Sequence, residues 1–275
     1  MYQDYWGLDR IPFENHMSPE FFFRSDTHQA ALLKMRYVVE NRLGAGLLVG
    51  GVGYGKTYLA HQFTRELPEE AGPFIQLLFP QLNSDELLSY LADELEAGDS
   101  LNTTTKQPLD QTIRRIERRL RHFTDEGRHP VMMIDDAHLI GDQRVFRTLQ
   151  LLLNFQQKTG IDFSLLLIGE RRLLAQVGQL AGLDERIGVK SLLQPLNREE
   201  TMGYIIHRLE IAGSEASIFD DEALTVLFEL SGGVPRRINR LCDLSLLVGF
   251  ADKLQTISAG TVEAVGDELA VAVPG

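Results

Sequence analysis

The chain has 275 residues, of which 44% are hydrophobic and 24% charged, as in a soluble globular protein of one large domain or two. Its net charge of −12 argues against a surface that generally coats DNA or anionic membranes, although a local basic patch stays possible. Cys242 is the lone cysteine, so we expect no intramolecular disulfide and a reducing, cytosolic compartment. The first residues lack signal-peptide features, and no apolar run approaches ~18 residues, so we expect no transmembrane segment.

Residues 1–25 are rich in aromatic side chains and are interrupted by Pro12 and Pro19, which predicts an irregular segment. Two interpretations are open: an aromatic strap that packs on the domain, or a segment that partly closes over an adenine ring, as apolar groups do in binding sites. A helix is expected from Ser25 or Asp26 to about Gly44, because apolar residues recur there at helical spacing.

A glycine-rich motif follows an apolar run and precedes a helical pattern, so it joins a strand to a helix. Its glycines let backbone N–H groups turn toward phosphate oxygens, and the helix N-terminus adds positive charge. Lys56 is expected to reach the β- and γ-phosphates, and the Thr57 hydroxyl to ligate Mg²⁺. The motif predicts ATP and Mg²⁺ as ligands, with these binding residues: Gly50, Gly51, Val52, Gly53, Tyr54, Gly55, Lys56, Thr57 and Tyr58.

The next segments predict a buried strand over 73–79, a helix from Ser84 and a mobile polar loop over 98–108. A further helix, about 109–126, has an apolar stripe and carries arginines mainly on its other face. These are Arg114, Arg115, Arg118, Arg119 and Arg121. They form either a solvated face or a contact for a partner or nucleic acid.

The run 131–136 reads as a strand buried on both faces that ends in two carboxylates. Ligands of parallel sheets gather at the carboxyl ends of the strands. We therefore expect Asp135 to hold Mg²⁺ through water and Asp136 to orient the attacking water.

A helix over about 141–157 leads to another buried strand, 163–170, and a fifth strand is expected over 187–193. Glu170 at the strand exit either senses the γ-phosphate or is an acid near a helix N-terminus. Beyond Pro195 the pattern is helical, over about 197–212, 220–230, 234–251 and 258–269. The expected domains are the strap, 1–25; an α/β nucleotide-binding domain, 26–195; and a small helical domain, 196–275.

Motifs along nearly the whole chain resemble those of AAA+ ATPases of the ExeA/GspA (general secretion pathway protein A) type, which includes relatives from exosortase and exopolysaccharide loci. The segments that carry the resemblance are Tyr5–Leu8, Pro12-Phe13, Phe21-Phe22, the phosphate loop, Ile134–His138, Leu167–Glu170, Ser231–Arg236 and Ile238-Asn239. The resemblance implies a parallel five-stranded sheet of order 5-1-4-3-2 and a helical lid. It also implies nucleotide between lid and sheet and a ring- or arc-shaped homo-oligomer.

The resemblance also gives roles to two arginines. Arg236 is similar to the lid arginine that reaches the γ-phosphate, and Arg186 to the arginine finger offered to a neighbouring subunit. A planar, permanently charged guanidinium suits phosphate oxygens in both roles. The structural alternatives are a helix-capping arginine for Arg236 and a surface ion pair for Arg186.

The sequence departs from the family in three respects. The family usually has Asp-Glu where this chain has Asp135-Asp136, so the catalytic carboxylate is one methylene short. Glu170 stands where relatives often carry a neutral Gln or Asn. The full-length secretion relatives continue into a membrane span and a peptidoglycan-binding region, whereas this sequence ends at Gly275.

The resulting hypothesis is an ATPase, with slow hydrolysis because of Asp136, that powers or regulates assembly of an envelope secretion, pilus or polysaccharide-export system. It would act in the cytoplasm or at the inner-membrane periphery, with an envelope-machinery protein as partner. One alternative is a DNA-binding AAA+ regulator of the transposition-helper kind, supported by the basic helix and opposed by the net charge. The other is an ATP-dependent scaffold that hydrolyses very slowly.

Overall fold

The computed structural model describes residues 2–14, 17–68, 70–97 and 107–271. Contacts divide the chain into two compact units. One comprises residues 1–26, 52–58 and 194–275, and the other comprises 27–51 and 59–193. We call the first the helical unit and the second the sheet unit. Most of the loop expected at 98–108 lies outside the described residues.

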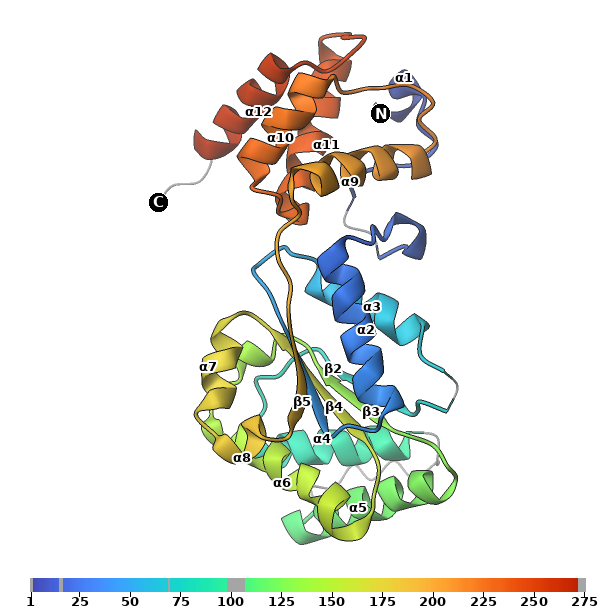
Figure 1. Ribbon diagram of the computed structural model, residues 1–275, viewed down its shortest axis with the longest axis vertical. Coiled ribbons are helices and arrows are strands. Elements are labelled where there is room, and N and C mark those ends of the chain that lie inside the picture. Colours follow the sequence, from blue (N-terminus) through green and yellow to red (C-terminus); the bar gives the residue numbers. More distant parts are fainter. Residues whose placement is uncertain (1, 15–16, 69, 98–106, 272–275) are drawn as a thin grey trace. The chain divides into compact units, whose positions relative to one another are not determined.

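The sheet unit contains five parallel strands in the order β2-β3-β4-β1-β5 (Figure 1). Their bounds are Ala45–Val49 for β1, Phe74–Leu77 for β2, Val131–Ile134 for β3, Ser164–Gly169 for β4 and Ile187–Leu192 for β5. Central β1 pairs with β4 on one side and β5 on the other, and β3 joins β4 to β2. This α/β fold, with its strand order and C-terminal helices, confirms the expected fold class.

Helices cover both faces of the sheet, which explains why the central strands are continuously apolar. Helix α2, Asp26–Glu40, lies on one face (Figure 1). On the other face α4, Ser84–Glu96; α5, Leu109–Asp125; and α6, Gln143–Thr159, share a core with alternate strand residues such as Leu47 and Leu167. The shorter helices are α3, Lys56–Arg65; η2, Ala137–Leu139; α7, Arg172–Gly178; and α8, Ala181–Asp184.

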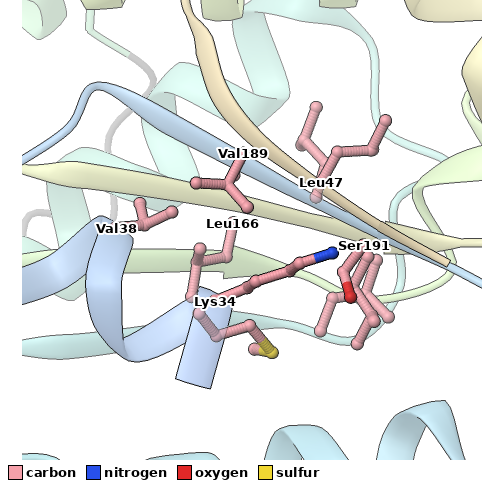
Figure 2. A pocket seen from close by; sticks show the side chains of 11 residues that line it. Lys34, Val38, Leu47, Leu166, Val189 and Ser191 are labelled. Carbon is pink, nitrogen blue, oxygen red and sulfur yellow. The ribbon is translucent and has the colours of Figure 1, made fainter. Parts of the chain in front are cut away.

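The packing of α2 on the sheet leaves one small cavity, which is lined by Lys34 and Val38 of α2 and by strand residues (Figure 2). Its volume of about 10 Å³ is room for roughly one water molecule. Gly46 brings the layers this close, because a methyl group there would lie 2.9 Å from Cγ2 of Val38. The cavity is a packing detail and too small for a nucleotide.

The helical unit contains α9, Arg198–Ile211; α10, Asp221–Ser231; α11, Pro235–Ala251; and α12, Ala259–Val271. The N-terminal segment, with α1, Gln3–Trp6, and η1, Pro19–Phe21, belongs to the same core through Trp6, Phe13 and Phe21. Trp6 donates a hydrogen bond from Nε1 to the carbonyl of Leu246, at 3.0 Å. The residues of the predicted strap thus pack on the C-terminal helices.

Several element ends differ from the sequence prediction. Helix α2 ends at Glu40 and not near Gly44, because Arg42 adopts a left-handed backbone with φ of 52°. The edge strand β2 spans Phe74–Leu77 and is shorter than the predicted 73–79, since Leu78 and Phe79 are exposed beyond it. Helices α7 and α8 were not predicted. In the described part of the chain, no helix has the length and apolarity needed to cross a bilayer.

A buried polar cluster lies near the amino ends of β3 and β4. The Ser164 hydroxyl donates to the carbonyl of Leu43 at 2.7 Å, so the His129 Nε2, 2.9 Å away, must donate to Ser164. The other ring nitrogen, Nδ1, is buried without a hydrogen-bond partner among the described residues. Burial lowers the pKa of His129 to about 4, because a charged ring would lose its hydration there.

We therefore expect His129 to destabilise the fold in acid. Its folded pKa of about 4 lies below the ordinary 6.5, so the unfolded chain takes up the proton first as pH falls below 6.5. The contribution of His129 to the free energy of unfolding is unchanged above pH 6.5 and falls between pH 6.5 and 4. His129→Gln keeps a donor for Ser164 but does not titrate. From pH 7 to 4.5, the wild type should lose about 2 kcal/mol more than this variant in urea unfolding.

The exposed His61 on α3 supplies the control. His61→Gln should keep the acid loss of the wild type. Equal pH dependence of the wild type and His129→Gln would show that His129 is not the acid-sensitive group.

Candidate functional site

The glycine-rich motif forms a loop from the carboxyl end of β1 to the start of α3 at Lys56. At the sheet, the Gly50 N–H donates to the carbonyl of Gly169 in β4 at 3.1 Å. Gly53 and Gly55 have φ of 78° and 84°, a region in which side-chain-bearing residues are strained. Lys56 is buried. The motif therefore has the strand–loop–helix setting that phosphate binding requires.

Gly53 lies against the start of α11 within the helical unit. A methyl group at Gly53 would come within 2.9 Å of Cβ of Arg236 and 3.1 Å of Cγ1 of Val234. The Arg236 N–H donates to the Gly53 carbonyl at 3.3 Å. The backbone of Arg236 thus contacts the tip of the loop, while its side chain is exposed. A guanidinium placed there can reach an anion that the loop binds.

Tyr58, in the first turn of α3, contacts the N-terminal segment. Its hydroxyl donates to the carbonyl of Ser18, and its ring packs edge-to-face on Phe22 with centroids 5.3 Å apart. Burial raises the pKa of Tyr58 to about 12, so the hydroxyl stays a donor at neutral pH. The N-terminal segment therefore touches the helix that begins with Lys56 and Thr57. It is this contact that would bring aromatic side chains near a nucleotide.

The two predicted carboxylates follow β3 in the sheet unit. The Asp135 N–H donates to the carbonyl of Leu77 at 3.0 Å and so continues the pairing with β2. The Asp135 carboxylate is buried and accepts from the Asp136 N–H at 2.8 Å. Asp136 then turns the chain with a left-handed φ of 47°, and its side chain is half-exposed. One acid is held in the sheet and the other is presented at its edge.

His138 lies between the exits of β3 and β4, although the sequence analysis gave it no role. Its Nε2 is 3.1 Å from Oε1 of Glu170, and its Nδ1 is 3.8 Å from Oδ1 of Asp136. The ring is buried, whereas Glu170 and Asp136 are partly exposed. The Asp-Asp-Ala-His run was the available sequence signal, but the contact with Glu170 needs the adjacency of β3 and β4.

Arg186, the predicted arginine finger, follows α8 and contacts its own unit. Its guanidinium donates to Oδ1 of Asn154 on α6 at 2.7 Å and to the carbonyl of Gly182. Both acceptors are neutral.

The basic helix α5 is largely engaged with acidic side chains. Arg115 donates to Glu96 at 2.7 Å and to Asp93 at 2.8 Å, and this contact lowers the pKa of Glu96 below its usual range. Further ion pairs are Arg118–Glu96 and Arg121–Glu117. Carboxylates that neutralise arginines oppose the use of this face against phosphate.

The geometry groups the predicted site residues within each unit. In the helical unit it brings Gly53 together with Arg236, and in the sheet unit it brings Asp135, Asp136 and Glu170 to the exits of two neighbouring strands. The carboxyl ends of β1, β3 and β4 share one edge of the parallel sheet, where ligands of such folds bind. A glycine loop, a lysine, a hydroxyl and carboxylates are the groups used to bind Mg·NTP.

Comparisons with known proteins agree with this geometry. A model of the AAA domain family matches residues 40–177. General secretion pathway protein A of Aeromonas hydrophila is 31% identical over 98% of this chain and 48% of its own length. An uncharacterised HTH-type transcriptional regulator of Methanocaldococcus jannaschii is 25% identical over 62% of this chain and 44% of its own. The chain thus spans about half the length of these relatives.

The structure is also similar to that of the ORC2 protein of Aeropyrum pernix, described as ADPNP–ADP complexes. The TM-score is 0.71 at 16% identity, covering 97% of this chain and 73% of the other. At this identity the similarity concerns the fold.

We expect Gly53→Ala to weaken ATP binding by about tenfold or more, because the added methyl must move the loop or Arg236. Gly127→Ala is the matched control. Gly127 has a similar φ of 77°, but a methyl group there meets nothing within 4 Å. Titration with a fluorescent ATP analogue measures both. Equal affinities for the two variants would show that the close approach of Gly53 to Arg236 does not serve binding.

Proposed function

Because the chain belongs to the AAA domain family and is similar throughout to general secretion pathway protein A, we propose that it binds and hydrolyses Mg·ATP to power or regulate assembly of an envelope secretion, pilus or polysaccharide-export system. The resemblance to the ExeA/GspA type is thereby confirmed, whereas the activity and the partner system are proposals. The observation that carries the ATPase proposal is the phosphate loop at the carboxyl end of β1, with acids at the exits of β3 and β4 in the same sheet.

The proposed roles follow from residue chemistry. The loop amides of residues 50–58 and Lys56 bind the phosphates, and Thr57 and Asp135 hold Mg²⁺. Asp136 orients the attacking water as general base, and Glu170 takes the place of the group that senses the γ-phosphate. Arg236 reaches the γ-phosphate from the lid. When bound, Mg²⁺ would neutralise charge on the β- and γ-phosphate oxygens.

The domain division into 1–25, 26–195 and 196–275 is likewise a proposal, as is a ring- or arc-shaped homo-oligomer in which Arg186 acts on a neighbouring subunit. In the single chain its guanidinium contacts two neutral acceptors, Asn154 and the Gly182 carbonyl. Phosphate oxygens of a nucleotide bound by a neighbouring subunit would offer this guanidinium charge-assisted hydrogen bonds, which are stronger than bonds to neutral acceptors. We place the protein in the cytoplasm or at the inner-membrane periphery, with an envelope-machinery protein as its partner.

A DNA-binding regulator is the second candidate, since one relative is an HTH-type regulator. The carboxylate pairs of α5 and the net charge of −12 oppose it. Salt-dependent anisotropy with labelled duplex DNA separates the two candidates. A very slow ATP-dependent scaffold differs from the main proposal only in rate and is separated by turnover.

Lys56→Ala should abolish ATP binding, because it removes the cation that the loop places against the β- and γ-phosphates. Lys190→Ala, which removes a surface lysine paired with Asp184, should bind like the wild type. Titration with fluorescent ATP measures both. Affinity of Lys56→Ala within threefold of the wild type would mean that the loop is not the site.

Asp136→Glu should raise kcat while leaving KM for ATP little changed. The longer side chain moves the carboxylate by roughly one C–C bond, and displacements of about 1 Å can cost on the order of a hundredfold in rate. An effect on kcat alone would place the limit in the chemical step. A rate below that of the wild type would show that the site is adapted to the shorter acid, and a wild-type rate for Asp136→Ala would remove this residue from the mechanism.

A further inference from the structure

The strongest unassigned feature of the sheet unit is the buried imidazole of His138 between the side chains of Asp136 and Glu170. Nε2 lies 3.1 Å from Oε1 of the Glu170 carboxylate, so this nitrogen is the ring atom that contacts the acid. Nδ1 faces Asp136 at 3.8 Å and is buried without a hydrogen bond in the described ranges of the chain. One rigid ring thus faces both acids that leave the strands at this edge.

The ring is held from several sides. Gly169 packs directly on it, because a methyl group at this glycine would lie 3.1 Å from both the His138 backbone nitrogen and its Nδ1. Gln176 of α7 donates from Nε2 to the His138 carbonyl at 3.3 Å and to the Ile140 carbonyl at 3.2 Å. A side chain with this little freedom can fix the position of a partly exposed carboxylate.

Glu170 needs such a partner more than a neutral residue would. A carboxylate beside Asp135, Asp136 and nucleotide phosphates is repelled by like charge, and a hydrogen-bond donor reduces that penalty. Among the described residues, Glu170 also contacts Arg172, whose Nε lies 3.8 Å from Oε2 and whose side chain is exposed. An exposed contact at that distance restrains a carboxylate weakly. His138 therefore supplies the buried contact of this carboxylate.

We propose that His138 is a positioning residue for ATP hydrolysis, which couples Glu170 at the exit of β4 to Asp136 at the exit of β3 so that the two acids act as one unit. The proposal rests on the proposed function, because the role exists only if Asp136 and Glu170 act on ATP. The effects on kcat of substitutions at Asp136, His138 and Glu170 should therefore not be additive.

Two substitutions at position 138 test the roles of Nε2 and Nδ1 separately. Gln carries an amide nitrogen that can take the place of Nε2 beside Glu170. Asn reaches only as far as Nδ1 and loses that contact. We expect His138→Asn to lower kcat about tenfold with KM for ATP within about twofold, and His138→Gln to stay within about threefold of the wild type. His122→Asn, which removes an exposed histidine 3.3 Å from Glu126, is the control that should not change kcat.

Glu170→Ala tests the same coupling at the other residue. Because the Glu170 side chain is partly exposed, we expect this variant to fold. If His138 acts through Glu170, this variant should match His138→Asn, and the double variant should lose no more than either single one. Losses that multiply in the double variant would overturn the inference, as would wild-type kcat for His138→Asn. Melting temperatures of all variants identify any loss that comes from unfolding.

The outcomes also separate this inference from the proposed function. A wild type that turns over ATP while His138→Asn is unchanged overturns the role of His138 and leaves the ATPase proposal standing. A wild type that binds Mg·ATP without measurable turnover overturns the role of His138 and favours the scaffold. A wild type that does not bind ATP overturns both.

Discussion

The candidate chemistry depends on the burial of the parallel sheet on both faces. Strand residues such as Leu47, Leu166 and Leu167 are enclosed by helices, so charged groups are excluded from the central strands β1, β3 and β4. Polar groups can emerge only where strands end, and the parallel direction puts all carboxyl ends at one edge. The phosphate loop, Asp135 and Glu170 all leave strands at that edge. The same constraint that stabilises the sheet therefore concentrates the polar groups.

A second constraint joins the N-terminal segment to the helical unit. The buried Arg208 guanidinium donates to the carbonyls of Pro12 at 2.5 Å and Glu14 at 2.8 Å, and it lies 4.9 Å from the ring centroid of Phe21. Burying a charge is costly unless its donors are satisfied, so these contacts hold the segment firmly. Tyr58 touches the same segment. Tyr58, in the first turn after the phosphate loop, thus belongs to the same packed unit as the C-terminal helices.

The departures from the family pattern become related once β3 and β4 are side by side. From sequence, Asp136 is one methylene short and Glu170 is a charge in a neutral place, and these are two separate observations. In the structure a single imidazole lies between them. The ring faces Asp136 at 3.8 Å through Nδ1 and contacts Glu170 at 3.1 Å through Nε2. The two departures are therefore neighbours in the structure, although they lie far apart in the sequence.

The sequence by itself determined the class of fold, because phosphate-loop spacing, continuous apolar strands and helical periodicity are local patterns that do not need tertiary contacts. It also identified four candidates: Lys56 and Thr57 fill fixed positions of the glycine-rich motif, and Asp135 and Asp136 end a buried strand. Only the tertiary structure decided the packing of the N-terminal segment on the C-terminal helices, the contacts of Arg186 with Asn154 and Gly182, and the place of His138. These depend on which residues distant in the chain become neighbours, and local propensity carries no information about that.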